Sequence, residues 1–179
     1  MYLANEIKAI PTMYKGVSFR SRLEARWAIV FDQLGIEWQY ETEGYDIQIE
    51  QDFSIRYIPD FMLTGGSVRC PDPLFVEVKG NMLPDDALKI EAFAQHYPIY
   101  VVNYVPADLM DICNGIDTDQ GIPYFNFQTV DGDYFGAVLG ARKGGGWGLF
   151  GADSSYWADM DEAKTRRAYA MARAAHFEY

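Results

Sequence analysis

The stretch YIPDFMLTGGSVRCPDPLFVEVKG, residues 57–80, carries the strongest chemical signal in this sequence. Its last part, LFVEVKG at 74–80, alternates with a period of two, which is typical of a β-strand. Side chains alternate across a strand, so Glu77 and Lys79 share one face while the valines between them share the other. If the valines face the core, the Glu–Lys pair points at a cleft or at water.

Asp60 follows Pro59 late in a second strand-like run, residues 54–63. The loop that follows is long enough for an antiparallel hairpin between 54–63 and 74–80, which would bring the Asp60 carboxylate near Glu77. Two carboxylates held close together repel each other unless a positive charge lies between them. The spacing therefore predicts a site for a cation.

A hard divalent cation such as Mg²⁺ or Mn²⁺ suits this arrangement, because it prefers carboxylate and water oxygens and leaves positions open for a substrate phosphate. We expect Asp60 and Glu77 as ligands, with the main-chain carbonyl of Val78 as a further one. Lys79 would lie beside a metal-activated water or stabilise charge on the phosphate.

Upstream of this stretch, residues 21–35 are predicted to form a helix, because apolar side chains recur at helical spacing and Gly35 suits a C-terminal stop. Two short strand-like runs follow, at 36–41 and 45–50.

Downstream, Pro84 and two acidic residues open a predicted helix that runs to about His96. The apolar run 99–105 is typical of a buried parallel strand. Strand 74–80, this helix and strand 99–105 would make one β-α-β unit.

The C-terminal part contains weaker signals. They predict a short helix at 107–113, two strands joined by a turn at Asp131–Gly132, a glycine-rich loop over 141–151 and one helix over 156–177. The spacing of the three glycines at 144–146 does not match a phosphate-binding P-loop.

Length and composition favour one globular domain over residues 1–179, since 49% of the residues are apolar. No apolar run is long enough to span a membrane, and the N-terminus lacks the pattern of a secretory signal. Cys70 and Cys113 are far apart in sequence and are expected to be free thiols in a reducing cytosol.

The net charge of −11 is unusual for a protein that handles nucleic acid, but it is unevenly distributed. Residues 1–30 carry five basic and two acidic side chains, for +3. Residues 31–141 carry four basic and nineteen acidic side chains, for −15. Residues 142–179 carry six basic and five acidic side chains, for +1. Contacts to a polyanion should therefore come from the two ends of the chain.

Proline–aspartate followed by glutamate–x–lysine across a β-hairpin resembles the PD-(D/E)XK nuclease superfamily, here with Pro59–Asp60 and Glu77–Val78–Lys79. The resemblance extends to Glu24 on the preceding helix, where members often carry another acidic ligand. It implies an α/β fold with a restriction-endonuclease-like core in the order α-β-β-β-α-β, a mixed central sheet flanked by helices. This core would cover residues 16–105, with 106–179 as an elaboration that ends in a β-hairpin and a terminal helix.

The resemblance is to small phage and bacterial nucleases of the transposase-endonuclease or resolvase kind. It implies a metal-dependent DNA endonuclease that leaves a 5′-phosphate and a 3′-hydroxyl. Asp60, Glu77, Lys79 and Glu24 would be catalytic, and all but Lys79 would hold Mg²⁺ or Mn²⁺. The partners would be DNA and, for cutting both strands, a second copy or a larger nucleoprotein complex, in the cytoplasm of a bacterium or a phage-infected host.

Each feature also has a simpler interpretation. Ser21 and Glu24 fit a capping box, in which Glu24 would accept a hydrogen bond from the Ser21 amide. Glu77 and Lys79 could form an exposed strand pair. The acidic group Glu41, Glu43 and Asp46 is expected first of all to form a solvated turn.

Several basic side chains could contact the DNA backbone or could simply be solvated. They are Arg20, Arg22 and Arg26 around Glu24, Lys89 on the helix after strand 74–80, and Arg166, Arg167 and Arg173 on the last helix. His96 and His176 have no companion ligands in the sequence. The alternative to an enzyme is a non-catalytic DNA- or protein-binding subunit on a nuclease-like fold, recruited by a partner.

Overall fold

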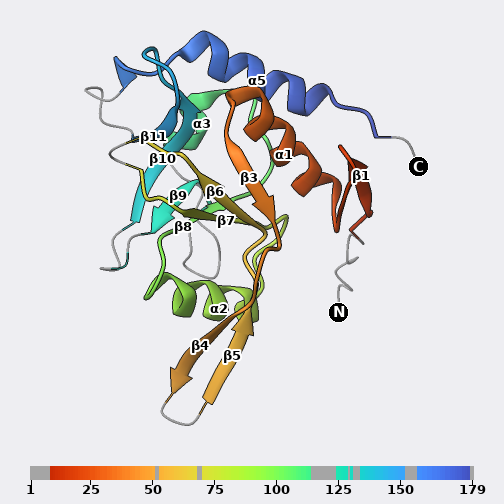
Figure 1. Ribbon diagram of the computed structural model, residues 1–179, viewed down its shortest axis with the longest axis vertical. Helices are drawn as coiled ribbons and strands as arrows, with labels where there is room; N and C mark the ends of the chain where they lie inside the picture. The colour runs from red at the N-terminus through yellow and green to blue at the C-terminus, as the bar shows by residue number, and fades with distance from the viewer. Residues whose placement is uncertain are drawn as a thin grey trace, which may run out of the picture.

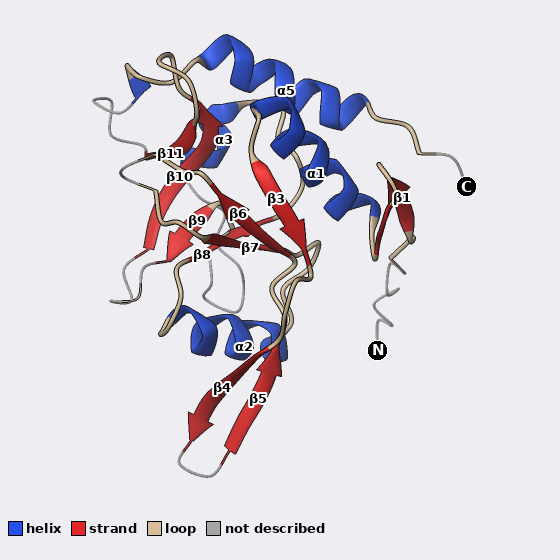
Figure 2. Ribbon diagram, viewed as in Figure 1, coloured by secondary structure: helices blue, strands red, loops and turns tan. Residues whose placement is uncertain are grey.

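The computed structural model describes residues 9–50, 53–67, 70–113, 124–128, 130, 134–151 and 157–177. Seven strands form one mixed sheet in the order β11-β10-β9-β8-β7-β6-β3 (Figures 1 and 2). β7 and β8 are parallel, and the other neighbouring pairs are antiparallel. The predicted α/β class is therefore confirmed. The bounds are β3 (Glu37–Tyr40), β6 (Phe61–Thr64), β7 (Leu74–Val78), β8 (Ile99–Val102), β9 (Asn126–Gln128), β10 (Tyr134–Ala141) and β11 (Trp147–Gly151).

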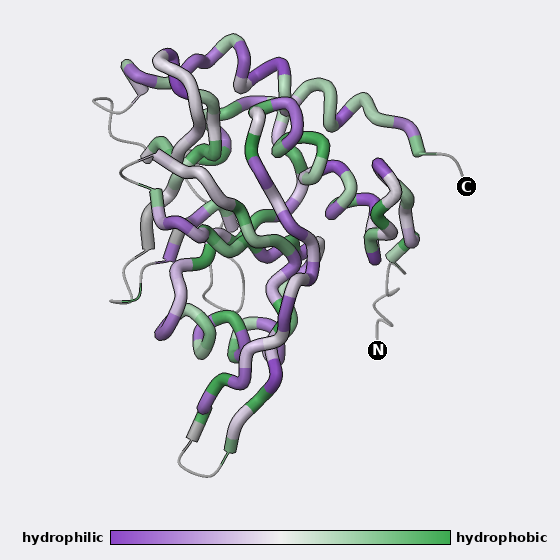
Figure 3. Tube along the Cα trace, in the orientation of Figure 1, coloured by the Kyte–Doolittle hydropathy of each residue, from purple (hydrophilic) through white to green (hydrophobic). Residues whose placement is uncertain are grey.

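Helices cover both faces of this sheet (Figure 1). α1 (Arg22–Leu34) and α5 (Glu162–Ala174) pack against each other on one face, and α2 (Pro84–Ala94) lies on the other. A short helix, α3 (Leu109–Cys113), packs against β10. Hydrophilic residues recur along α5 (Figure 3) because only a narrow side of it is buried.

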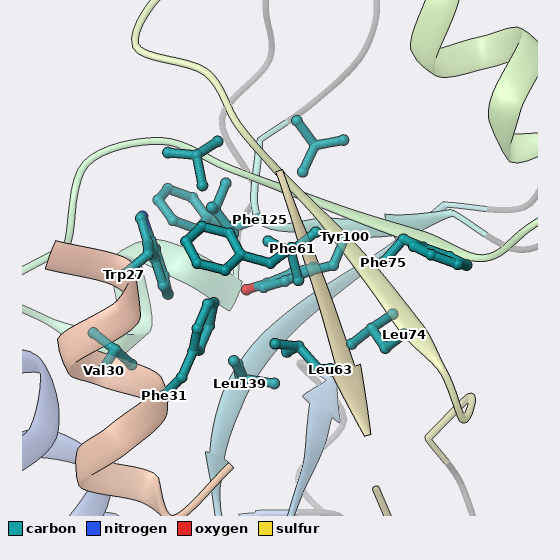
Figure 4. Close-up of a cluster of buried hydrophobic side chains, with 14 of the residues drawn as sticks. Trp27, Val30, Phe31, Phe61, Leu63, Leu74, Phe75, Tyr100, Phe125 and Leu139 are labelled. Atoms are coloured by element: carbon teal, nitrogen blue, oxygen red, sulfur yellow. The ribbon is translucent and has the colours of Figure 1, made fainter. Parts of the chain in front are cut away.

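The predicted first helix forms because both of its ends are capped and its apolar face packs against the sheet. The Ser21 side chain accepts a hydrogen bond from the Glu24 amide at 3.2 Å, and Gly35 ends the helix with a φ of 76°. Trp27 and Phe31 then point into the cluster that α1 forms with Phe61 and other apolar side chains of the sheet (Figure 4). This packing sets α1 on the sheet with its N-terminus near the ends of β3 and β7.

The predicted β-α-β unit is confirmed as β7, α2 and β8, with β7 and β8 parallel. Phe75 packs edge-on against Phe93 of α2, at 5.2 Å between ring centroids, and lies on the other side of the sheet from Phe61 (Figure 4). Because side chains alternate, Glu77 and Lys79 share the α2 side with Phe75.

The strand predicted over 54–63 is wrong as one element. Pro59 lacks an amide proton, and the run divides there into β5 (Phe53–Tyr57) and β6. β5 pairs with β4 (Tyr45–Glu50) in a separate hairpin that extends away from the main sheet (Figure 1). The element order is therefore the predicted α-β-β-β-α-β with this hairpin inserted before β6.

The glycine-rich segment 141–151 was predicted as a loop, but its second half is strand β11, which pairs with β10. Gly145 and Gly146 adopt φ values of 94° and 78°, so the glycines form the tight turn between these strands. The pairing of β9 with β10 confirms the predicted hairpin, and its Asp131–Gly132 turn lies outside the described residues.

Three further differences concern element ends and the N-terminus. The last helix starts at Glu162 rather than 156, because the Asp161 side chain caps it by accepting from the Lys164 amide. β8 ends at Val102 rather than 105. A small hairpin of β1 (Thr12–Tyr14) and β2 (Val17–Phe19) was not predicted.

Among the described residues, no helix combines the length and the apolar character needed to cross a bilayer. Cys70 is a buried free thiol, as expected.

Candidate functional site

The candidate site lies where β6 begins and β7 ends. Phe61 is opposite Val76 in the antiparallel register, and one further step places Asp60 opposite Glu77. The hydrogen bond from the Glu41 amide to the Asp60 carbonyl, at 3.0 Å, continues the β3–β6 ladder to this point. Directly opposed residues of an antiparallel pair project from the same face, so the two carboxylates lie on one side of the sheet.

Asp60 is buried, with 3% of its surface exposed, and both of its oxygens have partners. Oδ2 accepts a hydrogen bond from the Val78 amide at 2.8 Å, which ties the carboxylate to the end of β7. Oδ1 accepts one from Nη2 of Arg20 at 2.9 Å. The Val78 amide thus orients Asp60, and the role of the Val78 carbonyl stays a prediction.

Glu77 is equally buried, also at 3%, and this corrects the expectation that it points at a cleft or at water. All five residues of β7 are buried, and the face that Glu77 shares with Phe75 is covered by Phe93 of α2 and by Tyr45 and Tyr57 of the β4–β5 hairpin. Oε2 accepts a hydrogen bond from the Tyr57 hydroxyl at 2.6 Å, and Oε1 lies 2.9 Å from Nζ of Lys79. The alternative of an exposed Glu–Lys pair is therefore wrong.

The charge of Glu77 destabilises the charged form of the neighbouring Asp60. Burial, followed by the charge of Glu77, raises the pKa of Asp60 well above its ordinary value, and the charge of Glu24 adds to this. Burial also raises the pKa of Tyr57, and the Glu77 carboxylate that it contacts raises it further. The Tyr57 hydroxyl therefore keeps its proton and remains a donor to Glu77.

Lys79 lies between two carboxylates. Its Nζ is 2.9 Å from Glu77 and 3.2 Å from Oδ1 of Asp86, in the first turn of α2. Burial alone would lower the pKa of this lysine, but the nearby charges of Glu77, Asp60 and Asp86 raise it. The lysine is therefore held as an ammonium group.

Asp86 and Tyr57 are parts of the site that sequence reasoning missed. The sequence places Asp86 only among the acidic residues that open the predicted helix, and Asp86 does accept a hydrogen bond from the Leu83 amide at 3.3 Å. The contact between Asp86 and Lys79 depends on how α2 packs, so it cannot be predicted from the position of Asp86 two residues after Pro84. Tyr57 lies in the quoted stretch, and the alternation of β5 gave no sign that it would turn toward Glu77.

Glu24 is buried at the N-terminus of α1 and takes part in a cap. Oε1 accepts from the Ser21 hydroxyl at 2.7 Å, and Oε2 accepts from the Arg20 amide at 3.0 Å and from the Tyr40 hydroxyl. The partner amide is that of Arg20, one residue before the expected Ser21. A role for Glu24 as a metal ligand stays a prediction, and it would require some of these bonds to break.

Arg20 connects the site to the acidic turn after β3. Its Nη2 contacts Asp60 and also Oε1 of Glu41. Glu41 was predicted to belong to a solvated turn together with Glu43 and Asp46, and for Glu41 this is wrong because it forms an ion pair with Arg20. The positive φ of Glu41, 45°, marks the turn that brings its carboxylate back toward the site.

The residues fit a divalent cation held by two carboxylates. Within the described ranges, no three His, Cys, Asp or Glu side chains are grouped as a metal site by themselves. Mg²⁺ often binds through only one or two carboxylates and takes its other ligands from water and substrate phosphates. Each oxygen of Asp60 and Glu77 has one partner described above and can accept a second. Burial and the charge of Glu77 raise the pKa of Asp60, and a cation bound between the two carboxylates would favour the charged form of Asp60.

The predicted DNA-contacting residues are spread over several elements. Arg22 and Arg26 are half-buried on α1, Lys89 is half-buried on α2, and Arg167 is exposed on α5. Nε of Arg26 is buried, and it has no hydrogen-bond partner among the described residues. Arg166 contacts Glu162 at 2.7 Å and Asp108 at 3.4 Å, which offsets its charge.

Comparisons with known proteins give no match: no family profile matches the chain, and neither a curated protein nor a solved structure is significantly similar to it. Function must therefore be argued from the chemistry of the site.

Proposed function

We propose that the protein is a metal-dependent deoxyribonuclease with a restriction-endonuclease-like core of the PD-(D/E)XK type. The observation that carries the proposal is the meeting of Asp60, Glu77 and Lys79 on one face at the junction of β6 and β7. Burying two adjacent carboxylates is unfavourable for stability, and it is the arrangement that a hard cation requires.

Asp60 and Glu77 would hold Mg²⁺ or Mn²⁺. Bound there, the ion would supply positive charge that polarises a phosphoryl oxygen and lowers the pKa of a nearby water. The Val78 amide and the Tyr57 hydroxyl keep the two carboxylates oriented. These contacts reduce the reorganisation needed when substrate arrives.

Lys79 would stabilise the negative charge that develops on the scissile phosphate and orient the attacking water. The water oxygen forms a bond to phosphorus as the bond from phosphorus to the 3′ oxygen breaks. One proton leaves the water for solvent, and the 3′ oxygen takes one up, which leaves a 5′-phosphate and a 3′-hydroxyl. Asp86, 3.2 Å from the ammonium group, would keep Lys79 in place.

Nicking of supercoiled DNA tests the proposal. We expect conversion to the open circle with Mg²⁺ or Mn²⁺ and none with EDTA. Lys79→Ala should lower the rate by about 100-fold or more, as loss of a charge-stabilising group does elsewhere. Lys143→Ala is the matched control, because Lys143 is exposed on the β10–β11 turn and its Nζ contacts the Ala158 carbonyl at 2.7 Å. Cleavage that persists in EDTA would contradict the proposal.

A second candidate function is a non-catalytic binding subunit on the same fold. The −15 charge of residues 31–141 favours it, because phosphate contacts dominate affinity for DNA and an acidic surface opposes them. Such a subunit would show no metal-dependent nicking on supercoiled or branched DNA, alone or as a homodimer, and would act only through its partner.

A further inference from the structure

The backbone of Arg20 is held by hydrogen bonds, and its side chain is largely exposed. Its amide donates to Oε2 of Glu24 at 3.0 Å and to the Tyr40 hydroxyl at 3.2 Å, which holds the chain just before α1. Its side chain is 62% exposed, yet Nη2 reaches the buried Oδ1 of Asp60. A largely exposed cation thus contacts one oxygen of a buried carboxylate.

The oxygen that Arg20 covers is the one best placed for a metal ion. Oδ2 of Asp60 is held by the Val78 amide at 2.8 Å, whereas Oδ1 is bound by an exposed side chain. A divalent cation at Oδ1 would bring two positive charges close to the guanidinium, and like charges at such short range repel strongly. The ion and Arg20 therefore cannot both bind Asp60 favourably.

Resting on the proposed function, we propose that Arg20 is an internal counter-ion that competes with the divalent cation for Asp60 and, once displaced, contacts a phosphate of the nucleic acid. Arg20 neutralises part of the buried charge in the metal-free protein. The ion takes over that role when it binds, and the guanidinium becomes available beside the site.

A phosphate is the group that a displaced guanidinium recognises best, because its planar fork matches two phosphate oxygens. The fixed Arg20 backbone keeps the side chain within reach of the site. Glu41 contacts the same Nη2 atom, so the guanidinium retains one carboxylate partner when Asp60 is lost. Metal loading would thereby release the guanidinium from one of its two carboxylate partners and leave it able to contact a phosphate beside the site.

Metal affinity measured without DNA tests the competition. Calorimetric titration with Mn²⁺ should show that Arg20→Ala binds the ion on the order of tenfold more tightly than the wild type, because a charge-assisted pair no longer has to break. Arg20→Lys should lie between the two. Lys15→Ala is the control, since it also removes one exposed positive charge from the N-terminal segment, and Lys15 contacts Asp32 at 2.8 Å.

Thermal unfolding gives an independent readout on the same proteins. Mn²⁺ should raise the melting temperature of Arg20→Ala by more than that of the wild type, since the stabilisation by a ligand grows with the logarithm of the ratio of its concentration to its Kd. Equal Mn²⁺ affinity in the two proteins, including the case in which neither binds the ion, would overturn the competition.

The proposed contact between displaced Arg20 and a phosphate is tested by binding of a short DNA duplex. Ca²⁺ is present at saturating concentration to limit cleavage. Fluorescence anisotropy should show that Arg20→Ala binds the duplex about threefold to tenfold more weakly than Lys15→Ala. Unchanged DNA affinity would overturn the phosphate contact. Tighter Mn²⁺ binding by Arg20→Ala together with a wild type that never nicks DNA would support the competition and reject the nuclease function, so the two failures are distinguishable.

Discussion

Asp32 and Asp60 are two carboxylates beside the same sheet, and their surroundings shift their pKa values in opposite directions. Asp32, on α1, accepts hydrogen bonds from the Tyr14 hydroxyl at 2.7 Å and from Nε1 of Trp38 at 3.1 Å, and it lies 2.8 Å from Nζ of Lys15. Although partial burial alone would raise its pKa, these three donors lower it. Every nearby group therefore favours the charged form of Asp32.

Asp60 also has donors, but burial and a second carboxylate outweigh them and raise its pKa. The difference shows that the number of hydrogen bonds alone does not set the direction of a carboxylate's pKa shift. Burial and the neighbouring carboxylate do: both aspartates face a cation, but Asp60 is more deeply buried and also faces Glu77. A buried carboxylate that lies beside a second buried carboxylate is a candidate for binding a cation.

The largest expected effect is on catalysis. Asp60→Asn should lower Mg²⁺-dependent nicking by about 100-fold or more, because the amide is a poor ligand for the ion. Asp32→Asn should change the rate by less than about threefold. Both rates are to be measured on supercoiled DNA at equal protein concentration. Equal loss of activity in the two variants would remove the distinction between the carboxylates.

The next effect is on stability, and here Asp32→Asn should be more damaging than Asp60→Asn. Asp32→Asn should lower the free energy of unfolding by about 2 kcal/mol, because an amide cannot serve all three donors. Asp60→Asn should leave it unchanged or raise it in metal-free buffer, because one of two adjacent buried charges is removed while an oxygen remains for the Val78 amide. Urea unfolding at neutral pH measures both. A loss of more than about 1 kcal/mol in Asp60→Asn would contradict the interpretation of the site.

The smallest effect is the pH dependence that Asp32 confers. Its folded pKa lies below the ordinary value of 3.8, so its contribution is fully present above that pH and is lost as pH falls through the folded pKa. The stability difference between the wild type and Asp32→Asn should thus be constant near neutrality and shrink below about pH 4. Urea unfolding over a series of acidic pH values checks this, and a difference that grows on acidification would reverse the assignment.

Much of the architecture could be predicted because it rests on local patterns. The apolar spacing of residues 22–34, with Ser21 before them and Gly35 after, specifies a helix whatever packs against it. The β-α-β unit follows from an alternating run, a proline-initiated helix and an apolar run. The division at Pro59 was missed because two strands that join different sheets look continuous in sequence.

Local patterns in the sequence predict only part of the candidate site. Alternation along β7 predicts that Glu77 and Lys79 share a face, and the strand pairing brings Asp60 opposite Glu77. Burial of that face was not predicted, because it depends on α2 and on a hairpin that packs from elsewhere in the chain.

The sequence by itself determined the helix and strand periods and the order of the acidic and basic groups along the chain, because both depend on neighbours a few residues apart. Only the tertiary structure decided which cation each carboxylate meets. Arg20 reaches Asp60 across forty positions of sequence, and Lys79 meets Asp86 only because α2 packs back on β7. Charge interactions act through space over a few ångströms, so the chemistry of these groups is set by the fold and not by their spacing in the chain.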